Sequence, residues 1–217
     1  MAVWTGIAVG LMGWLVAGGL PRLARFTVSQ LVENPVFPRF NSVFFQGAVA
    51  AAFLLVFGLE ESGTDRVIGW FFILFLATAV LTDLAYGLIP DRLTIPGGFF
   101  FLAVRLLFGE TTLLSYPAGW LIGGAVLWTV ARLSRGGMGG GDVKLAAASG
   151  GCLGWPDIAA GLVVSVFAGG LFAVFLWVSG AVGRRTALPF GPFLAVGFLT
   201  AWAWAEELIR WYLSFFP

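Results

Sequence analysis

The feature that most constrains this chain is a succession of apolar segments, each about long enough to cross a lipid bilayer as a helix. Of 217 residues, 59% are hydrophobic and 11% are charged. A soluble domain carries about 25% charged residues, so this composition excludes a water-soluble globule, a disordered tail and a nucleic-acid-binding protein. A bilayer core about 30 Å thick needs roughly 20 apolar residues of helix. We therefore predict an all-α polytopic membrane protein with eight segments: 3–20, 43–59, 68–86, 93–108, 115–133, 143–155, 158–182 and 190–212.

The sixth and the first of these segments differ from an ordinary membrane span in length or position. The sixth, 143–155, would reach about 20 Å as a straight helix, so we expect a half-helix or a re-entrant segment there. The first lacks the basic residues and the small-residue cleavage site of a signal peptide, so we expect a retained span.

Basic residues orient the segments, because Lys and Arg near the ends of membrane spans stay on the cytoplasmic side. With an external N-terminus and eight crossings, nine of the twelve basic residues fall in cytoplasmic connections. With seven crossings the last basic pair would fall outside, which favours eight. The nine residues are Arg22, Arg25, Arg39, Arg92, Arg132, Arg135, Lys144, Arg184 and Arg185.

The chain reads as one membrane domain over residues 1–217, because it shows no internal repeat and no long linker. Its longest irregular stretch is 21–41, which contains Pro21, Pro35 and Pro38. We expect a cytoplasmic loop there, in which Arg22 and Arg25 meet anionic lipid headgroups.

The residue types that are missing narrow the chemistry. The sequence has no histidine and one cysteine, Cys152. The first absence excludes Ser-His-Asp and Cys-His catalysis and zinc sites that need imidazole. A single cysteine excludes an intrachain disulfide and a cysteine-cluster metal site. We expect no bound metal.

Asp83 lies inside the third segment, about one turn from its predicted cytoplasmic end. A carboxylate at the centre of a span costs about 2.5–3.5 kcal/mol on insertion scales and is by default a candidate for function. The structural alternative is an acid that reaches water at the end of the span or pairs with Arg92.

Asp142 follows a glycine-rich run, 136–141, and precedes a helix-forming run, 143–149. The structural interpretation is a helix N-cap, where Asp is favoured. The functional interpretation is a catalytic pair with Asp83, because both residues fall on the predicted cytoplasmic side of the membrane. Two carboxyls in a desolvated site cannot both ionise, so one takes a proton from water while the other protonates a peptide carbonyl.

Three stretches occur in order: Asp83-Leu-Ala-Tyr-Gly-Leu-Ile-Pro-Asp91, Gly139-Gly-Gly-Asp-Val-Lys-Leu145 and Leu188-Pro-Phe-Gly-Pro-Phe-Leu-Ala195. Together they resemble the type IV prepilin peptidases, which are GxGD-type membrane aspartyl proteases. The likeness covers about residues 75–200, within a predicted peptidase core of 68–200. It implies that Asp83 and Asp142 are catalytic, and that the enzyme lies in the bacterial inner membrane with its active site toward the cytoplasm.

The same resemblance implies substrates that are prepilins or pseudopilins, cleaved between a short basic leader and an apolar helix. We expect Glu33 and Asp91 to meet the leader. Gly139 and Gly141 would allow strained backbone angles and a close approach of the substrate. Six residues are expected to shape the site or bind substrate: Gly139, Gly141, Lys144, Pro189, Gly191 and Pro192.

Several of these positions have a plainer interpretation. Lys144 either acts on Asp142 or anchors the loop at the lipid headgroups. Asp91 most simply caps the fourth helix after Pro90. The run Pro189-Phe-Gly-Pro192 either lines the site or only breaks the chain before the last helix.

One departure from the family concerns methylation. Many bacterial members carry two Cys-x-x-Cys pairs in an N-terminal cytoplasmic loop and methylate the new N-terminus with S-adenosylmethionine. Residues 21–41 stand in that place and contain no cysteine. N-methylation is therefore without support in the sequence, and S-adenosylmethionine is expected only if methylation is retained.

Two rival classes remain open at this stage. A proton-coupled transporter would use the same aspartates as a relay, although they fall near one face of the membrane. A silent scaffold of a pilus assembly would not need intact acids at both positions. Whether the chain is a monomer or a homo-oligomer is open.

Overall fold

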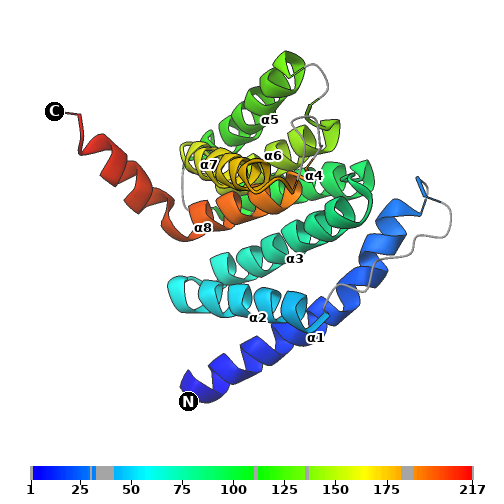
Figure 1. Cartoon of the computed structure of the whole chain (residues 1–217). Helices are drawn as coiled ribbons and strands as arrows, with labels where there is room; N and C mark the ends of the chain where they lie inside the picture. The colour runs from blue at the N-terminus through cyan, green and yellow to red at the C-terminus, as the bar shows by residue number, and fades with distance from the viewer. Residues whose placement is uncertain are drawn as a thin grey trace.

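The computed structural model describes residues 2–29, 31–32, 42–109, 112–134, 137–181 and 188–216. Over these residues the chain forms eight helices and no strand (Figure 1). The all-α prediction is confirmed. The helices are α1 (Ala2–Val28), α2 (Ser42–Leu59), α3 (Gly63–Tyr86), α4 (Asp91–Phe108), α5 (Ser115–Leu133), α6 (Gly140–Leu153), α7 (Asp157–Val178) and α8 (Gly191–Leu213).

Each helix coincides with one predicted apolar segment, because in lipid a continuous helix satisfies every backbone hydrogen bond internally. Within the described ranges, three helical stretches are long and apolar enough to cross a membrane, judged by length and composition alone: Trp4–Val28, Gly63–Tyr86 and Asp157–Val178. Helix α6, with 14 residues, has a length of about 21 Å. The expectation of a short sixth segment is confirmed.

The predicted loop 21–41 is wrong at its start, because α1 continues through Pro21 to Val28. The added turns are amphipathic: Ala24 and Val28 are buried, while Arg22 and Arg25 are exposed. Burial of this stripe offsets the one backbone hydrogen bond that a proline removes. Residues 33–41, including Glu33 and Arg39, lie outside the described part of the chain, as do Arg135, Arg184 and Arg185.

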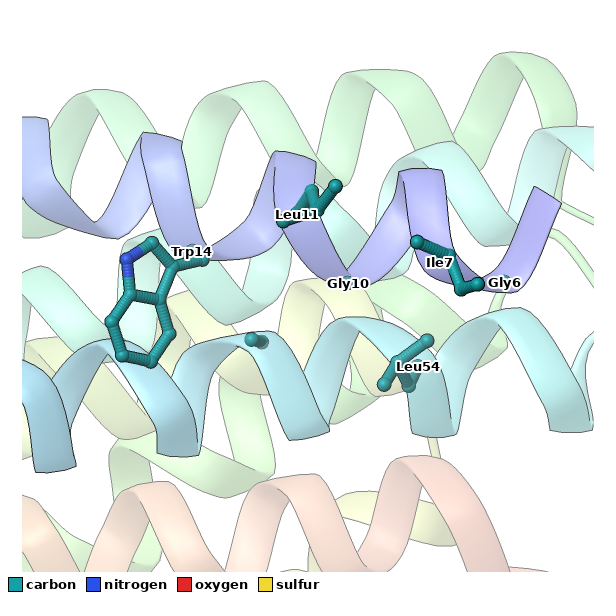
Figure 2. A pocket seen from close by; sticks show the side chains of 7 residues that line it. Gly6, Ile7, Gly10, Leu11, Trp14 and Leu54 are labelled. Atoms are coloured by element: carbon teal, nitrogen blue, oxygen red, sulfur yellow. The ribbon is translucent and has the colours of Figure 1, made fainter. Parts of the chain in front are cut away.

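Helices α1 and α2 pack closely through small residues. A Cβ added at Gly13 would lie 3.0 Å from the Phe53 Cβ and 3.1 Å from the Ala50 Cα. Small residues let helix backbones approach in membranes. Beside this contact an apolar groove opens, lined in part by Gly6, Gly10 and Leu54 (Figure 2).

The core gathers around α6, which packs most extensively against α5 and α4, while α7 pairs with α8. Phe72, Phe101, Leu145 and Phe198 are fully buried there. Helix α8 is kinked at Trp204, whose φ of −144° is not helical. The C-terminal end, red in Figure 1, bends away from the bundle.

Candidate active site

One end of the bundle brings together the C-terminus of α3 and the N-termini of α4, α6 and α8. We call it the aspartate end, because Asp83 lies in the last turn of α3 and Asp142 in the first turn of α6. Both side chains are buried, at 6% and 8% exposure. Helix α6 packs against both α3 and α8, so the two carboxyls lie at the same end of neighbouring helices.

The Asp83 carboxylate is held by the N-terminus of α8. Its Oδ2 accepts the backbone N–H of Gly191 at 2.7 Å, and Gly191 is the first residue of that helix. The N–H groups of a first helical turn have no partner within the helix and carry a partial positive charge. The start of α8 therefore offers this buried carboxyl a hydrogen-bond donor that has no partner within the helix.

Glycine at 191 is required by the same contact. A Cβ there would lie 2.8 Å from Asp83 Oδ2 and 3.1 Å from its Cβ. Pro192 follows within the first helical turn, where a proline sacrifices no hydrogen bond. The run 189–192 thus starts a helix and also contacts the site, through Gly191.

Asp142 is arranged differently. The N-cap of α6 is Gly139, not Asp142 as the structural interpretation had it, and Asp142 is the third helical residue. Its Oδ2 accepts the Gly139 N–H at 3.2 Å, which is half of a capping box. Its Oδ1 is buried and has no hydrogen-bond partner among the described residues. One oxygen of this carboxyl thus remains for a ligand or a water molecule.

Close packing joins α6 to the connection between α3 and α4. A Cβ added at Gly141 would lie 2.8 Å from the Ile89 carbonyl oxygen and 2.9 Å from its Cβ. At Gly139 the nearest atom, Asp142 Oδ2, would lie 3.4 Å away. The backbone is ordinary at Gly139, with φ −74°, so the expected strained angle there is wrong. Gly141, by lacking a side chain, lets the start of α6 pack closely against Ile89.

Lys144 pairs with Asp91 at the rim of this end. Its Nζ donates to both carboxylate oxygens of Asp91, at 2.6 and 2.7 Å, and both side chains are exposed. Asp91 does not cap α4, whose N-cap is Pro90. Arg92 lies over the Phe26 ring, 5.7 Å from its centroid, and Asp83 accepts the backbone N–H of Gly191.

Sequence reasoning missed a buried arginine at the opposite end. Arg105 of α4 is 8% exposed, forms an ion pair with Asp65 of α3 and donates from Nε to the Cys152 carbonyl at 2.8 Å. Its guanidinium lies 4.9 Å from the centroid of Trp202 and 5.5 Å from that of Tyr116. The sequence does contain a signal for this residue, because Arg105 is a lone cation within the apolar segment 93–108.

Arg105 therefore connects the two helices that carry the aspartates. The Cys152 carbonyl belongs to the last turn of α6, where carbonyls lack a partner within the helix. Among the described residues no cluster of three or more His, Cys, Asp or Glu side chains is placed to hold a metal ion.

The sequence that forms this site is similar to that of known proteins. A family model described as the type IV leader peptidase family matches residues 70–174, which include both aspartates. A prepilin leader peptidase/N-methyltransferase of Xanthomonas campestris is 30% identical over 218 residues, covering 95% of this chain and 70% of that protein. The chain belongs to the type IV leader peptidase family. The resemblance seen in the sequence is confirmed.

Other relatives of the leader peptidase family bear the same name. Identity is 37% over 147 residues for that of Aeromonas salmonicida, covering 64% of this chain and 50% of the relative. It is 36% over 147 residues for that of Bacillus subtilis, covering 66% and 58%. The chain thus spans about half the length of several relatives it matches. Comparison with solved structures gave no match.

Proposed function

We propose that this chain is a membrane aspartyl endopeptidase that removes the basic leader from prepilin-like substrates at the cytoplasmic face of the bacterial inner membrane. The observation that supports the proposal is that one end of the bundle holds two buried carboxyls, Asp83 and Asp142. The first accepts the N–H of a helix N-terminus, and the second has an oxygen without a hydrogen-bond partner among the described residues. Helices α3 to α8, which include the predicted core 68–200, would form the peptidase, with α1 and α2 against its side.

The unlike environments of the two aspartates suggest their roles. Asp83, charged and held by Gly191, takes a proton from water as the water oxygen bonds to the peptide carbonyl carbon. Asp142 gives its proton to the carbonyl oxygen. The tetrahedral intermediate then collapses: the C–N bond breaks, Asp83 passes its proton to the leaving amine, and Asp142 regains one from the intermediate's hydroxyl. The enzyme ends in its starting state.

The distribution of basic residues supports the orientation. Arg22 and Arg25 near the end of α1, Arg92 at the start of α4, Arg132 at the end of α5 and Lys144 belong to helix ends on the aspartate side of the bundle. Basic residues near span ends remain cytoplasmic. The aspartates would then face the cytoplasm, where a basic leader stays during membrane insertion of its substrate.

Methylation is not part of the proposal. The relatives' name includes N-methyltransferase, but residues 21–41 contain no cysteine, and Cys152 is buried within α6. The residues present therefore do not fit the family's cysteine-bearing loop. We assign no step to S-adenosylmethionine.

The test uses the purified protein in detergent with a prepilin that carries a basic leader. Wild type should release the leader, while Asp83→Asn and Asp142→Asn should not. Asp157→Asn, at the start of α7 and the opposite end of the bundle, is the matched control and should cleave normally. Full cleavage by either aspartate variant would contradict the two-aspartate mechanism.

A further inference from the structure

Three charged side chains are buried in the part of the chain that the structure describes: Asp83, Asp142 and Arg105. The proposed mechanism uses the two aspartates and gives the arginine no role. Arg105 lies in the last turn of α4, at the end of the bundle remote from the two carboxyls. A cation buried in a membrane helix is costly and is by default a candidate for function.

The Arg105 guanidinium contacts four helices other than its own. Its ion pair with Asp65 reaches α3, and its Nε donates to the Cys152 carbonyl of α6 at 2.8 Å. Its central carbon lies 5.5 Å from the ring centroid of Tyr116 on α5 and 4.9 Å from that of Trp202 on α8. A planar guanidinium, with five donors in a fixed fork and a face that stacks on aromatic rings, can make all these contacts at once.

Trp202 extends this set of contacts from α8 to α3. Its ring centroid lies 5.7 Å from that of Phe72, and a Cβ added at Gly69 would lie 2.9 Å from its Cζ2. Its Nε1 is buried and has no hydrogen-bond partner among the described residues. Packing against α3 and Arg105 therefore holds this ring in place.

Three of the helices that meet at Arg105 also form the candidate site. Asp83 comes from α3, Asp142 from α6, and the N–H that Asp83 accepts from Gly191 of α8. In α6, Asp142 and Cys152 stand ten residues apart, which is about 15 Å of helix. A packed helix moves as a rigid element, so a contact that fixes its far end limits how far its near end can slide or turn.

We propose that Arg105 is a positioning residue, which holds α3, α6 and α8 in the register that brings Asp83 and Asp142 to a common site at the other end of the bundle. The inference rests on the proposed function, because that function gives the two carboxyls a shared substrate. Arg105 contacts neither carboxyl and takes no part in the chemistry. It acts through the helices that carry them.

The test separates the placement of the two carboxyls from the stability of the fold. Arg105→Lys keeps a cation for Asp65 but replaces the planar fork with a point charge. The double variant Arg105→Met with Asp65→Leu removes both charges and leaves neither unpaired. Leu20→Ala is the control: Leu20 is buried on α1, which carries no residue of the candidate site, and its truncation destabilises the fold.

Leader release and thermal unfolding are measured on the same samples, with kinetics at a temperature where every variant is folded. Arg105→Lys and the double variant should lower kcat roughly tenfold to hundredfold, the cost of displacing a catalytic group by about 1 Å. Their KM should stay within about twofold of wild type. Leu20→Ala should lower Tm and keep the kcat of wild type. Wild-type kcat in either Arg105 variant, or a kcat that follows Tm across all three variants, overturns the proposal.

A distance measurement separates this inference from the function on which it rests. Spin labels are attached to cysteines introduced by Leu84→Cys on α3 and Lys144→Cys on α6, both exposed positions near the two carboxyls, while the buried Cys152 is left in place. Arg105→Lys should shift or broaden the distribution of distances between the labels, and Leu20→Ala should not. An unchanged distribution in Arg105→Lys overturns the positioning role. If wild type releases no leader while Arg105→Lys still alters the distribution, the proposed function fails and the role of Arg105 in helix register stands.

Discussion

Asp83 and Gly191 lie 108 residues apart in the chain, and the carboxylate of one accepts the backbone N–H of the other at 2.7 Å. The contact ties the end of α3 to the start of α8. It also gives the buried Asp83 carboxyl a donor from a helix N-terminus, the end of a helix that favours an anion.

Gly191→Ala should lower kcat by roughly tenfold to hundredfold, the cost of displacing a catalytic group by about 1 Å. The physical reason is the added Cβ, which would lie 2.8 Å from Asp83 Oδ2. Leader release from prepilin measures the effect. Gly170→Ala is the control, because an added Cβ at Gly170 meets nothing within 4 Å. Equal activity in both variants would remove Gly191 from the site.

Two adjacent glycines give a matched pair. Gly141→Ala places a Cβ 2.8 Å from the Ile89 carbonyl oxygen, whereas Gly140→Ala meets nothing within 4 Å. Backbone cannot give way as a side chain can, so Gly141→Ala should move the start of α6 and with it Asp142. We expect its cleavage rate to fall at least tenfold, and that of Gly140→Ala to match wild type. A similar loss in both would mean that the contact with Ile89 is not the cause.

The Lys144 and Asp91 pair should matter little for stability. Exposed ion pairs contribute about 0.2–1 kcal/mol, and Lys144 donates to Asp91 rather than to Asp142. In a double-mutant cycle of Lys144→Gln and Asp91→Asn, unfolding in detergent should give a coupling energy in that range. Because both side chains stand at the rim, cleavage should change by less than tenfold. A loss as large as that of Asp142→Asn would mean that Lys144 takes part in the chemistry.

The buried pair at the other end should behave in the opposite way. Arg105→Met leaves Asp65 and the Cys152 carbonyl without their cationic partner, and breaking a buried pair costs about 3–5 kcal/mol. Thermal unfolding in detergent should show this as a large drop in Tm. The double variant Arg105→Met with Asp65→Leu should recover part of it, because it leaves no unpaired charge. Arg210→Met, at an exposed position, is the control and should unfold like wild type.

The helices could be predicted from sequence because each apolar segment alone specifies a membrane helix. The end of α1 could not, since Pro21 and two arginines resemble a loop until the buried stripe of Ala24 and Val28 is seen. The pairing of aspartates at one end followed from counting crossings. Their partners did not follow: Gly191 meets Asp83 across 108 residues, and Lys144 meets Asp91 across 53. No periodicity in one sequence encodes such distant contacts.

The ion pair of Arg105 and Asp65 also bears on how the protein enters the membrane. An arginine alone in an apolar segment is costly to insert, and Asp65 on α3 is the group that neutralises it. Helices α3 and α4 are joined by the short connection 87–90. We expect them to leave the translocon together as a hairpin, with the charge already paired. Assembly of the aspartate end would then begin during synthesis, when α3 waits at the translocon for α4.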